Sequence, residues 1–344
     1  MFRKVPKESN TRSVLFCFVV TILILHTLSR GFKAEDNIPE YKDNQIANTP
    51  MGGCDGSKVV VPAVFGSIVS KPSRSSAAIV RYGTFYGGFN LPGNDMCWLA
   101  EPDPEGIIVY SFGVGEDCSW DISLASLAPG KIKIFLFDPT PRAKQHFDAV
   151  RHTLETKSIP QAYEGGRVQD YVNPSTGEKS EISGGVDASK WFEQVARSNV
   201  RSSDLTFQPY GLWNTDTQLE FFAPGSGVSH SFTAKGSGKS IKVEAKRLST
   251  LMTMFAHKRL DILKFDVEGA EVQVVPDMVA YFKESGIWPK MILFDHDSLR
   301  GKGQRYKLQD ALKTPDIVIK TLLDAGYRLF SYHNFDAVFV LNRL

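Results

Sequence analysis

The chain has 344 residues, of which 42% are hydrophobic and 23% are charged, and this is the composition of a folded globular protein. Its net charge of +2 argues against a dedicated nucleic-acid-binding protein, so we expect no nucleic-acid partner. The four cysteines lack the paired spacing of a zinc site, but Cys54 and Cys97 could form a disulfide in an oxidising compartment. The length suits either two domains or one large α/β domain.

The N-terminal segment has the pattern of a membrane signal. Basic residues at the start precede an apolar run at residues 14–28, which is shorter than the ~20 residues that usually span a bilayer. An uncleaved signal anchor and a cleaved signal peptide both fit; we favour the anchor, because no small-residue cleavage site follows directly. The basic flank predicts that residues 1–13 stay cytoplasmic. The chain is then a single-pass type II membrane protein of the Golgi or endoplasmic reticulum; if the signal is cleaved, it is secreted.

Residues 29–78 have the composition of a stem between this signal and the folded part. Lys, Asp, Asn, Pro, Gly and Ser dominate there, so the segment buries too little apolar surface to fold alone. Residues 161–190 are similarly rich in Gly, Ser, Glu and Lys, and we expect them to form an excursion from the domain surface. The folded domain is therefore predicted to cover residues 79–344.

Within this domain, short apolar runs alternate with helix-compatible segments. The predicted strands are residues 107–111, 132–137, 205–209, 260–265 and 291–294, with an extended or hairpin segment at 213–222 and a final antiparallel pair at 327–331 and 337–341. The predicted helices are residues 119–127, 141–155, 191–197, 247–257 and 315–325. Strands and helices that alternate at this spacing predict a single α/β domain with a mainly parallel sheet.

A glycine-containing loop, SFGVGEDCSWD, follows the first predicted strand. Gly113 and Gly115 allow a sharp turn and a close approach of the backbone to a ligand. The loop lacks the third glycine of a dinucleotide-binding loop, and a pyrophosphate would be repelled by Glu116 and Asp117. A cofactor that carries an ammonium group would be attracted instead. The alternative is an ordinary turn between a strand and a helix.

Asp138 ends the second predicted strand, in the segment FDPTPR. An acidic side chain at the tip of the strand beside the glycine loop is placed to accept hydrogen bonds from the ribose hydroxyls of an adenosine. Its alternative role is the N-cap of the helix that begins at Pro141, which Thr140 could supply equally well.

Carboxylates also follow the strand at residues 260–265, in the segment LDILKFDVEGAE. Asp266 and Glu268 lie just before a break at Gly269, and ligands of α/β sheets bind beyond the carboxyl ends of the strands. Together with Asp295, these acids could hold a divalent cation, because hard cations take carboxylate oxygens. Acids at strand ends more often bind substrate or cap helices, so we do not favour a metal.

Seven segments in this order resemble the FkbM family of S-adenosylmethionine-dependent methyltransferases: YSFGVGEDCSWD, FDPTPR, PYGLW, VSHSF, KRLSTLM, DILKFDVEGAE and GYRLF. The resemblance runs from about Val109 to the C-terminus. It implies a Rossmann-like seven-stranded methyltransferase fold with a mostly parallel sheet and an antiparallel strand near the C-terminus. It also implies an S-adenosylmethionine cofactor and methylation of a hydroxyl, often on a sugar or polyketide.

The resemblance further implies which residues lie at each part of the cofactor. These are Gly113 and Gly115 at the methionine part, Glu116 and Asp117 at its amino group, Asp138 at the ribose, Tyr210 and Gly211 at the adenine, and Asp266 and Glu268 at the methyl-transfer region. Two positions depart from the pattern. Many methyltransferases carry an acid where this chain has Ser111, and relatives often have a Glu and paired His where this chain reads LFDHDSLR.

A sugar hydroxyl is a poor nucleophile at neutral pH, so its methylation requires a base or a metal. His296 is our first candidate for the base, because an ordinary histidine titrates close to working pH. Its alternative role is that of a hydrogen-bonded histidine at a strand end. His230, in the segment VSHSF, is the second candidate.

These observations predict an O-methyltransferase that acts on glycan hydroxyls in the secretory pathway. A lipid, a protein or a small molecule is the alternative acceptor. A nicotinamide-dependent oxidoreductase is a second alternative, which the missing third glycine and the acidic Asp117 disfavour. A non-catalytic cofactor-binding domain is a third, which the presence of Asp138, Asp266 and Glu268 disfavours.

Overall fold

The computed structural model describes residues 79–82, 89–92, 106–160, 188–222, 240–296, 316–333 and 336–342. All of these residues belong to the part of the chain from Thr49 to Leu344. The predicted tail, membrane helix and stem, the Cys54–Cys97 pair and most of the excursion at 161–190 lie outside the described residues. Within the described ranges, no helix is both long and apolar enough to cross a membrane.

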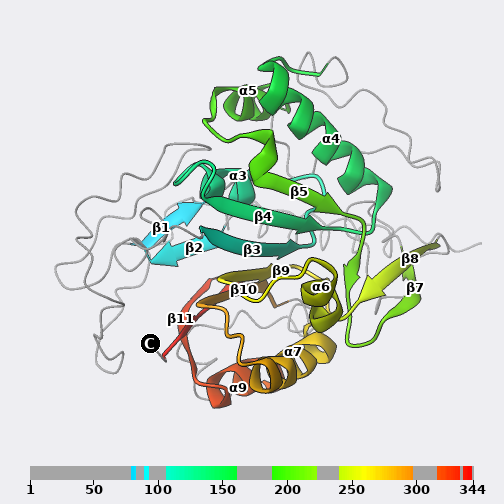
Figure 1. Cartoon of the computed structure of the whole chain (residues 1–344), viewed down its shortest axis with the longest axis vertical. Helices are drawn as coiled ribbons and strands as arrows, with labels where there is room; N and C mark the ends of the chain where they lie inside the picture. Colours follow the sequence, from blue (N-terminus) through cyan, green and yellow to red (C-terminus); the bar gives the residue numbers. More distant parts are fainter. Residues whose placement is uncertain are drawn as a thin grey trace, which may run out of the picture. The chain divides into compact units, whose positions relative to one another are not determined.

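Seven strands form one sheet in the order β11-β12-β10-β9-β3-β4-β5 (Figure 1). Strand β12 runs antiparallel to its neighbours β10 and β11, and the remaining pairs are parallel. The prediction of an α/β domain with a mostly parallel sheet and an antiparallel strand near the C-terminus is therefore confirmed. The strands are β3 (Ile107–Phe112), β4 (Ile132–Phe137), β5 (Leu205–Gln208), β9 (Ile262–Phe265), β10 (Met291–Asp295), β11 (Tyr327–His333) and β12 (Asp336–Leu341).

Helices cover both faces of this sheet (Figure 1). One apolar cluster joins the sheet to α3, α4 and α5, and we call this side the first face. A second cluster joins it to α6, α7 and α9 on the second face. The helices are α3 (Ser119–Ala125), α4 (Pro141–Thr156), α5 (Ala188–Arg197), α6 (Leu248–Met254), α7 (Glu271–Ser285) and α9 (Ile317–Asp324), and a 3-10 helix spans Ser202–Asp204.

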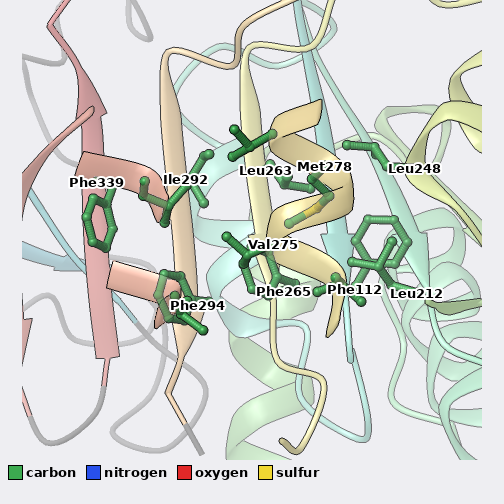
Figure 2. Packing of buried hydrophobic residues seen from close by; sticks show 14 of the residues in the cluster. Phe112, Leu212, Leu248, Leu263, Phe265, Val275, Met278, Ile292, Phe294 and Phe339 are labelled. Atoms are coloured by element: carbon green, nitrogen blue, oxygen red, sulfur yellow. The ribbon is translucent and has the colours of Figure 1, made fainter. Parts of the chain in front are cut away.

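The central strands are apolar along their length because both of their faces are buried. On the second face, Val275 and Met278 of α7 lie over Leu263 and Phe265 of β9 (Figure 2). Aromatic rings stack along the carboxyl ends of the strands on that face, with centroids 5.0 Å apart between Phe265 and Phe294. This packing keeps the carboxyl ends of neighbouring strands in register, so the residues that follow these strands lie at the same edge of the sheet.

Two smaller sheets complete the described part of the chain. Strands β6 (Gly211–Leu212), β8 (Ser240–Lys246) and β7 (Thr217–Phe222) pair in that order, and β1 (Ile79–Tyr82) pairs with β2 (Phe89–Pro92). The sequence predicts only one extended or hairpin segment at 213–222 and no strand at 240–246. Strand β8 alternates polar and apolar residues and buries only Val243 and Ala245, so it lacks the apolar run that marks a core strand.

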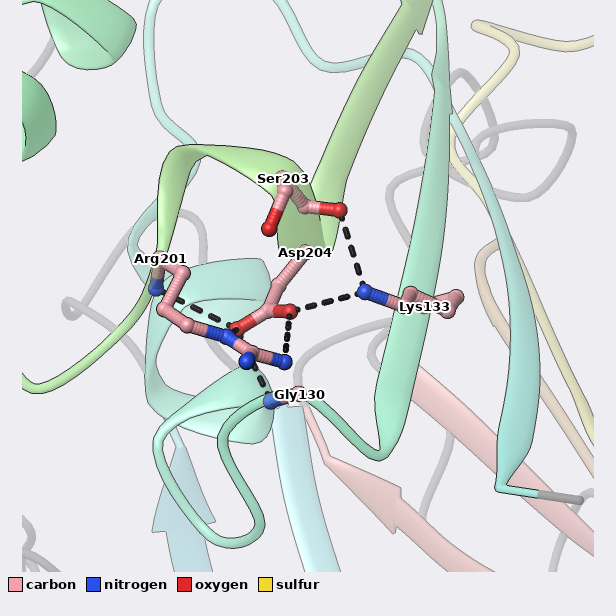
Figure 3. Close-up of polar contacts among 5 residues, drawn as sticks. All are labelled: Gly130, Lys133, Arg201, Ser203 and Asp204. Atoms are coloured by element: carbon pink, nitrogen blue, oxygen red, sulfur yellow. Dashed lines mark hydrogen bonds and ion pairs between the residues drawn. The ribbon is translucent and has the colours of Figure 1, made fainter.

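Asp204 links the amino ends of β4 and β5 through hydrogen bonds and ion pairs (Figure 3). This is the edge of the sheet opposite to the carboxyl ends of the parallel strands. Its Oδ2 accepts hydrogen bonds from the backbone N–H groups of Gly130 at 3.0 Å and Arg201 at 3.2 Å. Its Oδ1 lies 3.0 Å from Lys133 Nζ and 3.2 Å from Arg201 Nη2. The Asp204 side chain is fully buried, whereas those of Lys133 and Arg201 are 39% and 56% exposed.

Asp204→Ala is therefore expected to destabilise the domain by roughly 2–3 kcal/mol, because two backbone donors lose their acceptor. In a domain of this size that loss corresponds to a fall of roughly 4–12 °C in Tm, measured by thermal unfolding. Lys133→Met is the matched control, since it removes a half-exposed ion pair worth less than about 1 kcal/mol and an exposed hydrogen bond to the carbonyl of Ser203. Equal melting of Asp204→Ala and the wild type would contradict this role of the carboxylate.

Candidate functional site

The carboxyl ends of four parallel strands lie at one edge of the sheet. Phe112 of β3 is in register with Phe137 of β4 and with Phe265 of β9. Phe265 is in turn in register with Phe294 of β10. The residues that follow these strand positions therefore share this edge; they are Gly113, Asp138, Asp266 and Asp295.

The order of the strands reverses at β3, since β4 and β5 lie on one side of it and β9 and β10 on the other. Ligands of open α/β sheets bind at such a switch point, beyond the carboxyl ends of the strands. Here Gly113 meets the start of the DVEGAE segment: a Cβ on Gly113 would lie only 1.8 Å from the backbone oxygen of Asp266. Gly113 also has a φ of +74°, and its N–H donates to the carbonyl of Phe137 at 2.9 Å.

Asp138 ties the glycine loop to the end of β4. Its Oδ2 accepts a hydrogen bond from Gly115 N at 2.9 Å, and its Oδ1 accepts from the N–H and hydroxyl of Thr140 at 2.8 and 2.6 Å. The Thr140 hydroxyl in turn accepts from Ala143 N at 3.3 Å, so Thr140 is the N-cap of α4. Asp138 is thus not itself the cap, and its contact with a ribose stays a prediction.

Glu116 and Asp117, the two acids of the loop, contact other parts of the chain. Glu116 forms an ion pair with Arg142 of α4 at 2.5 Å, and both side chains are buried. The Oδ1 of Asp117 accepts from Ser119 N at 2.8 Å at the start of α3. Arg142 therefore offsets the charge of Glu116, and the predicted position of the two acids near an ammonium group stays untested. The sequence analysis did not identify Arg142. The feature that could have indicated its role is a cation in the first turn of a helix, where the helix dipole disfavours positive charge.

The turn after β9 has an unusual backbone. Glu268 has a φ of +52°, which is rare for a residue other than glycine, and Gly269 follows at +95°. The N–H of Gly269 donates to Oε1 of the buried Glu271 at 3.1 Å. Left-handed backbone at a non-glycine residue costs roughly 1–2 kcal/mol and is concentrated at functional sites. The predicted roles of Asp266 and Glu268 at methyl transfer stay predictions, and both side chains lie half-buried at this edge.

His296 follows β10 and is fully buried. Its Nε2 lies 2.6 Å from Oδ2 of Asp316, and its Nδ1 lies 3.4 Å from the hydroxyl of Tyr332. Asp316 also caps α9 by accepting from the N–H groups of Val318 and Ile319. Burial would raise the pKa of Asp316, but the contact with His296 and these N–H groups lower it overall. Asp316 was also missed, although it stands where a helix N-cap is expected.

Tyr210 and Gly211 follow β5. Tyr210 is half-buried against the second apolar cluster, and its ring centroid is 5.7 Å from Lys246 Nζ. Gly211 begins β6 and is buried. Their predicted contact with adenine stays untested. His230 and Asp297 lie outside the described residues.

A glycine loop, an acid at the end of the next strand and a DVEGAE turn thus meet at the switch point of a mostly parallel sheet. The protein-family model of the methyltransferase FkbM domain matches residues 127–329, which is more than half of the chain. The chain belongs to the FkbM methyltransferase family. This confirms the resemblance to the FkbM family that was seen in the sequence.

A solved structure, the methyltransferase FkbM from Methylobacillus flagellatus KT, is similar to this FkbM domain with a TM-score of 0.34 and 10% sequence identity. The alignment covers 69% of this chain and 44% of that chain, so this chain spans less than half of that protein's length. A comparison with curated proteins found no match.

A metal site in the FkbM domain was the alternative for Asp266, Glu268 and Asp295. Across the described ranges, no group of three or more His, Cys, Asp or Glu residues could hold a metal ion. These three acids, all of which are described, thus form no such group in this structure.

Proposed function

We propose that this FkbM domain transfers the methyl group of S-adenosylmethionine to a hydroxyl group. The observation that carries this proposal is the junction of the glycine loop with Asp138 and Asp266 at the switch point of the sheet. Adenosylmethionine supplies an electrophilic methyl group, so the protein has only to position the acceptor and remove its proton.

The residues at this edge fit such a cofactor. A Cβ on Gly115 would meet nothing within 4 Å, so the backbone of the loop faces open space there. Of the roughly four lone-pair sites of the Asp138 carboxylate, two on Oδ1 and one on Oδ2 are used, so a site on Oδ2 remains that can accept from a ribose hydroxyl. In this proposal, Gly113 and Gly115 face the methionine part, and Asp138 binds the ribose.

His296 is the proposed base, with Asp316 as its partner. A carboxylate at 2.6 Å from Nε2 favours the tautomer that carries the proton on Nε2, which leaves Nδ1 as the basic nitrogen. Nδ1 faces Tyr332 in the present conformation. Hydrogen bonds of catalytic groups often tighten only in the substrate complex, so this geometry is compatible with a base. A base of this kind typically contributes about 10²–10⁴-fold to the rate.

The proposed acceptor is a carbohydrate hydroxyl in the secretory pathway. Support comes from the basic flank, apolar run and polar stem at the start of the sequence. These features support a catalytic domain that lies in the lumen of the Golgi or endoplasmic reticulum, or outside the cell if the signal is cleaved. A lipid, protein or small-molecule acceptor is the alternative.

The test is methyl transfer by the full-length protein from methyl-labelled adenosylmethionine to separate panels of glycans, lipids, proteins and small molecules. Label in a glycan, stable to mild base as an ether is, is the expected result. Label only in another panel would contradict the glycan acceptor. Binding of adenosylmethionine without transfer to any panel would instead favour a non-catalytic cofactor-binding domain.

Asp138→Ala is expected to weaken binding of adenosylmethionine by about 10- to 100-fold, because charge-assisted hydrogen bonds are worth about 1.5–3 kcal/mol. Turnover at saturating cofactor should change much less. Asp138→Asn is the matched control, since its amide oxygen can still accept from Gly115 N while the charge is lost. Calorimetric binding measures both variants, and an unchanged affinity in Asp138→Ala would remove this residue from the cofactor site.

A further inference from the structure

The segment DPTPR, which connects β4 to α4, alternates polar residues with proline. The polar residues Asp138, Thr140 and Arg142 are buried, whereas Pro139 and Pro141 are partly exposed. Each proline ring fixes the backbone φ of its own residue and also restricts the backbone of the residue before it. The connection is therefore rigid, and its three buried polar side chains start from a backbone with little conformational freedom.

Two of these side chains bind consecutive residues of the glycine loop. Asp138 Oδ2 accepts a hydrogen bond from the backbone N–H of Gly115 at 2.9 Å. Arg142 Nη2 donates a hydrogen bond to Oε2 of Glu116 at 2.5 Å. The third side chain, that of Thr140, caps α4. The rigid connection thus holds the loop where its backbone faces open space, since a Cβ on Gly115 would meet nothing within 4 Å.

The ion pair of Arg142 with Glu116 is not explained by stability alone. Both side chains are only 8% exposed, and the cost of removing two charges from water offsets most of their mutual attraction. Arg142 also lies in the first turn of α4, where the helix dipole disfavours a cation. Two apolar side chains of similar volume could stabilise such a site equally well. The ion pair adds direction, because a charged hydrogen bond fixes the relative position of its two partners and an apolar contact does not.

We propose that Arg142 is a positioning residue of the cofactor site, which holds the glycine loop through Glu116 in the conformation that binds the methionine part of adenosylmethionine. This inference rests on the proposed function, in which the loop faces the methionine part and Asp138 binds the ribose. A loop that moved away from α4 would lose its contacts with the methionine part, while Asp138 would still bind the ribose. In this arrangement the carboxylate of Glu116 serves the loop and does not bind the ammonium group of the cofactor.

The test compares two ligands by calorimetry on the full-length protein: adenosylmethionine, and 5′-methylthioadenosine, which has the adenosine part but lacks the amino and carboxylate groups of methionine. We expect Arg142→Met to weaken the binding of adenosylmethionine by about tenfold or more, and to leave the affinity for 5′-methylthioadenosine within about twofold. The matched control is Asp138→Ala, which should weaken the binding of both ligands, because both contain the ribose.

A second variant separates this role from a loss of stability. Arg142→Met removes a charged partner of the buried Glu116 carboxylate, so its Tm should fall. The double variant Glu116→Leu/Arg142→Met removes both charges, so its Tm should return to near that of the wild type. Its affinity for adenosylmethionine, relative to 5′-methylthioadenosine, should nevertheless stay reduced by about fivefold or more, because an apolar pair does not fix the loop.

Equal weakening of both ligands, or a wild-type ratio of the two affinities in the double variant, would show that the ion pair only supports the fold. Tighter binding of adenosylmethionine in Arg142→Met would also overturn the inference, because it would assign the released Glu116 to the ammonium group. A folded wild type that binds no adenosylmethionine at all would instead overturn the proposed cofactor, and this inference with it.

Discussion

Gly113→Ala is expected to prevent the glycine loop from packing against the DVEGAE turn. The new Cβ would lie 1.8 Å from the backbone oxygen of Asp266 and 2.8 Å from its carbonyl carbon, and backbone cannot move aside as a flexible side chain can. The φ of +74° adds strain for any residue with a side chain. We expect a loss of more than about 4 kcal/mol, the range of the most damaging single substitutions. Thermal unfolding measures this loss.

Gly115→Ala is the matched control for that substitution. It also has a positive φ, of +53°, but its Cβ would meet open space, so we expect a stability cost of only roughly 1–2 kcal/mol. The added methyl group would occupy the space proposed for the cofactor, so adenosylmethionine binding should weaken. A Gly113→Ala protein that melts within a few degrees of the wild type would contradict the tight contact between the loop and Asp266.

His296→Ala is expected to lower kcat by about 10²–10⁴-fold and to leave the affinity for adenosylmethionine nearly intact, as for removal of a base. His296 is buried, so the variant also leaves a cavity and has to be assayed at a temperature at which it stays folded. Steady-state kinetics and cofactor calorimetry separate the two effects. Equal loss of turnover and of cofactor affinity would count against His296 as the base.

Asp316→Asn is the matched variant for the partner of His296. Asparagine is as good an N-cap as aspartate, so α9 should keep its cap while His296 loses the carboxylate. We expect a smaller fall in kcat than in His296→Ala. Because the folded protein lowers the pKa of Asp316, the carboxylate stabilises the fold at neutral pH and this contribution is lost on acidification. The Tm difference between wild type and Asp316→Asn should therefore shrink toward acid pH.

The sequence alone determined the central sheet and the family. The runs at 107–111 and 132–137 match β3 and β4 to within a residue, because strands buried on both faces are apolar throughout. The glycine loop, Asp138 and the DVEGAE segment also reached one edge as expected, since parallel strands end at the same side of a sheet.

Only the tertiary structure decided the polar contacts around that edge. These contacts join segments that lie up to about 140 residues apart in the chain. They are the pair of Glu116 with Arg142, the pair of His296 with Asp316, and the burial of Asp121 near Lys264. Hydrophobic burial leaves a local periodic pattern in the sequence, whereas an ion pair depends on the register of distant elements and leaves none. Strand β8 was missed for a different reason: its alternation of polar and apolar residues is typical of a half-buried strand, but it lacks the continuous apolar run by which the strands at the centre of the sheet were found.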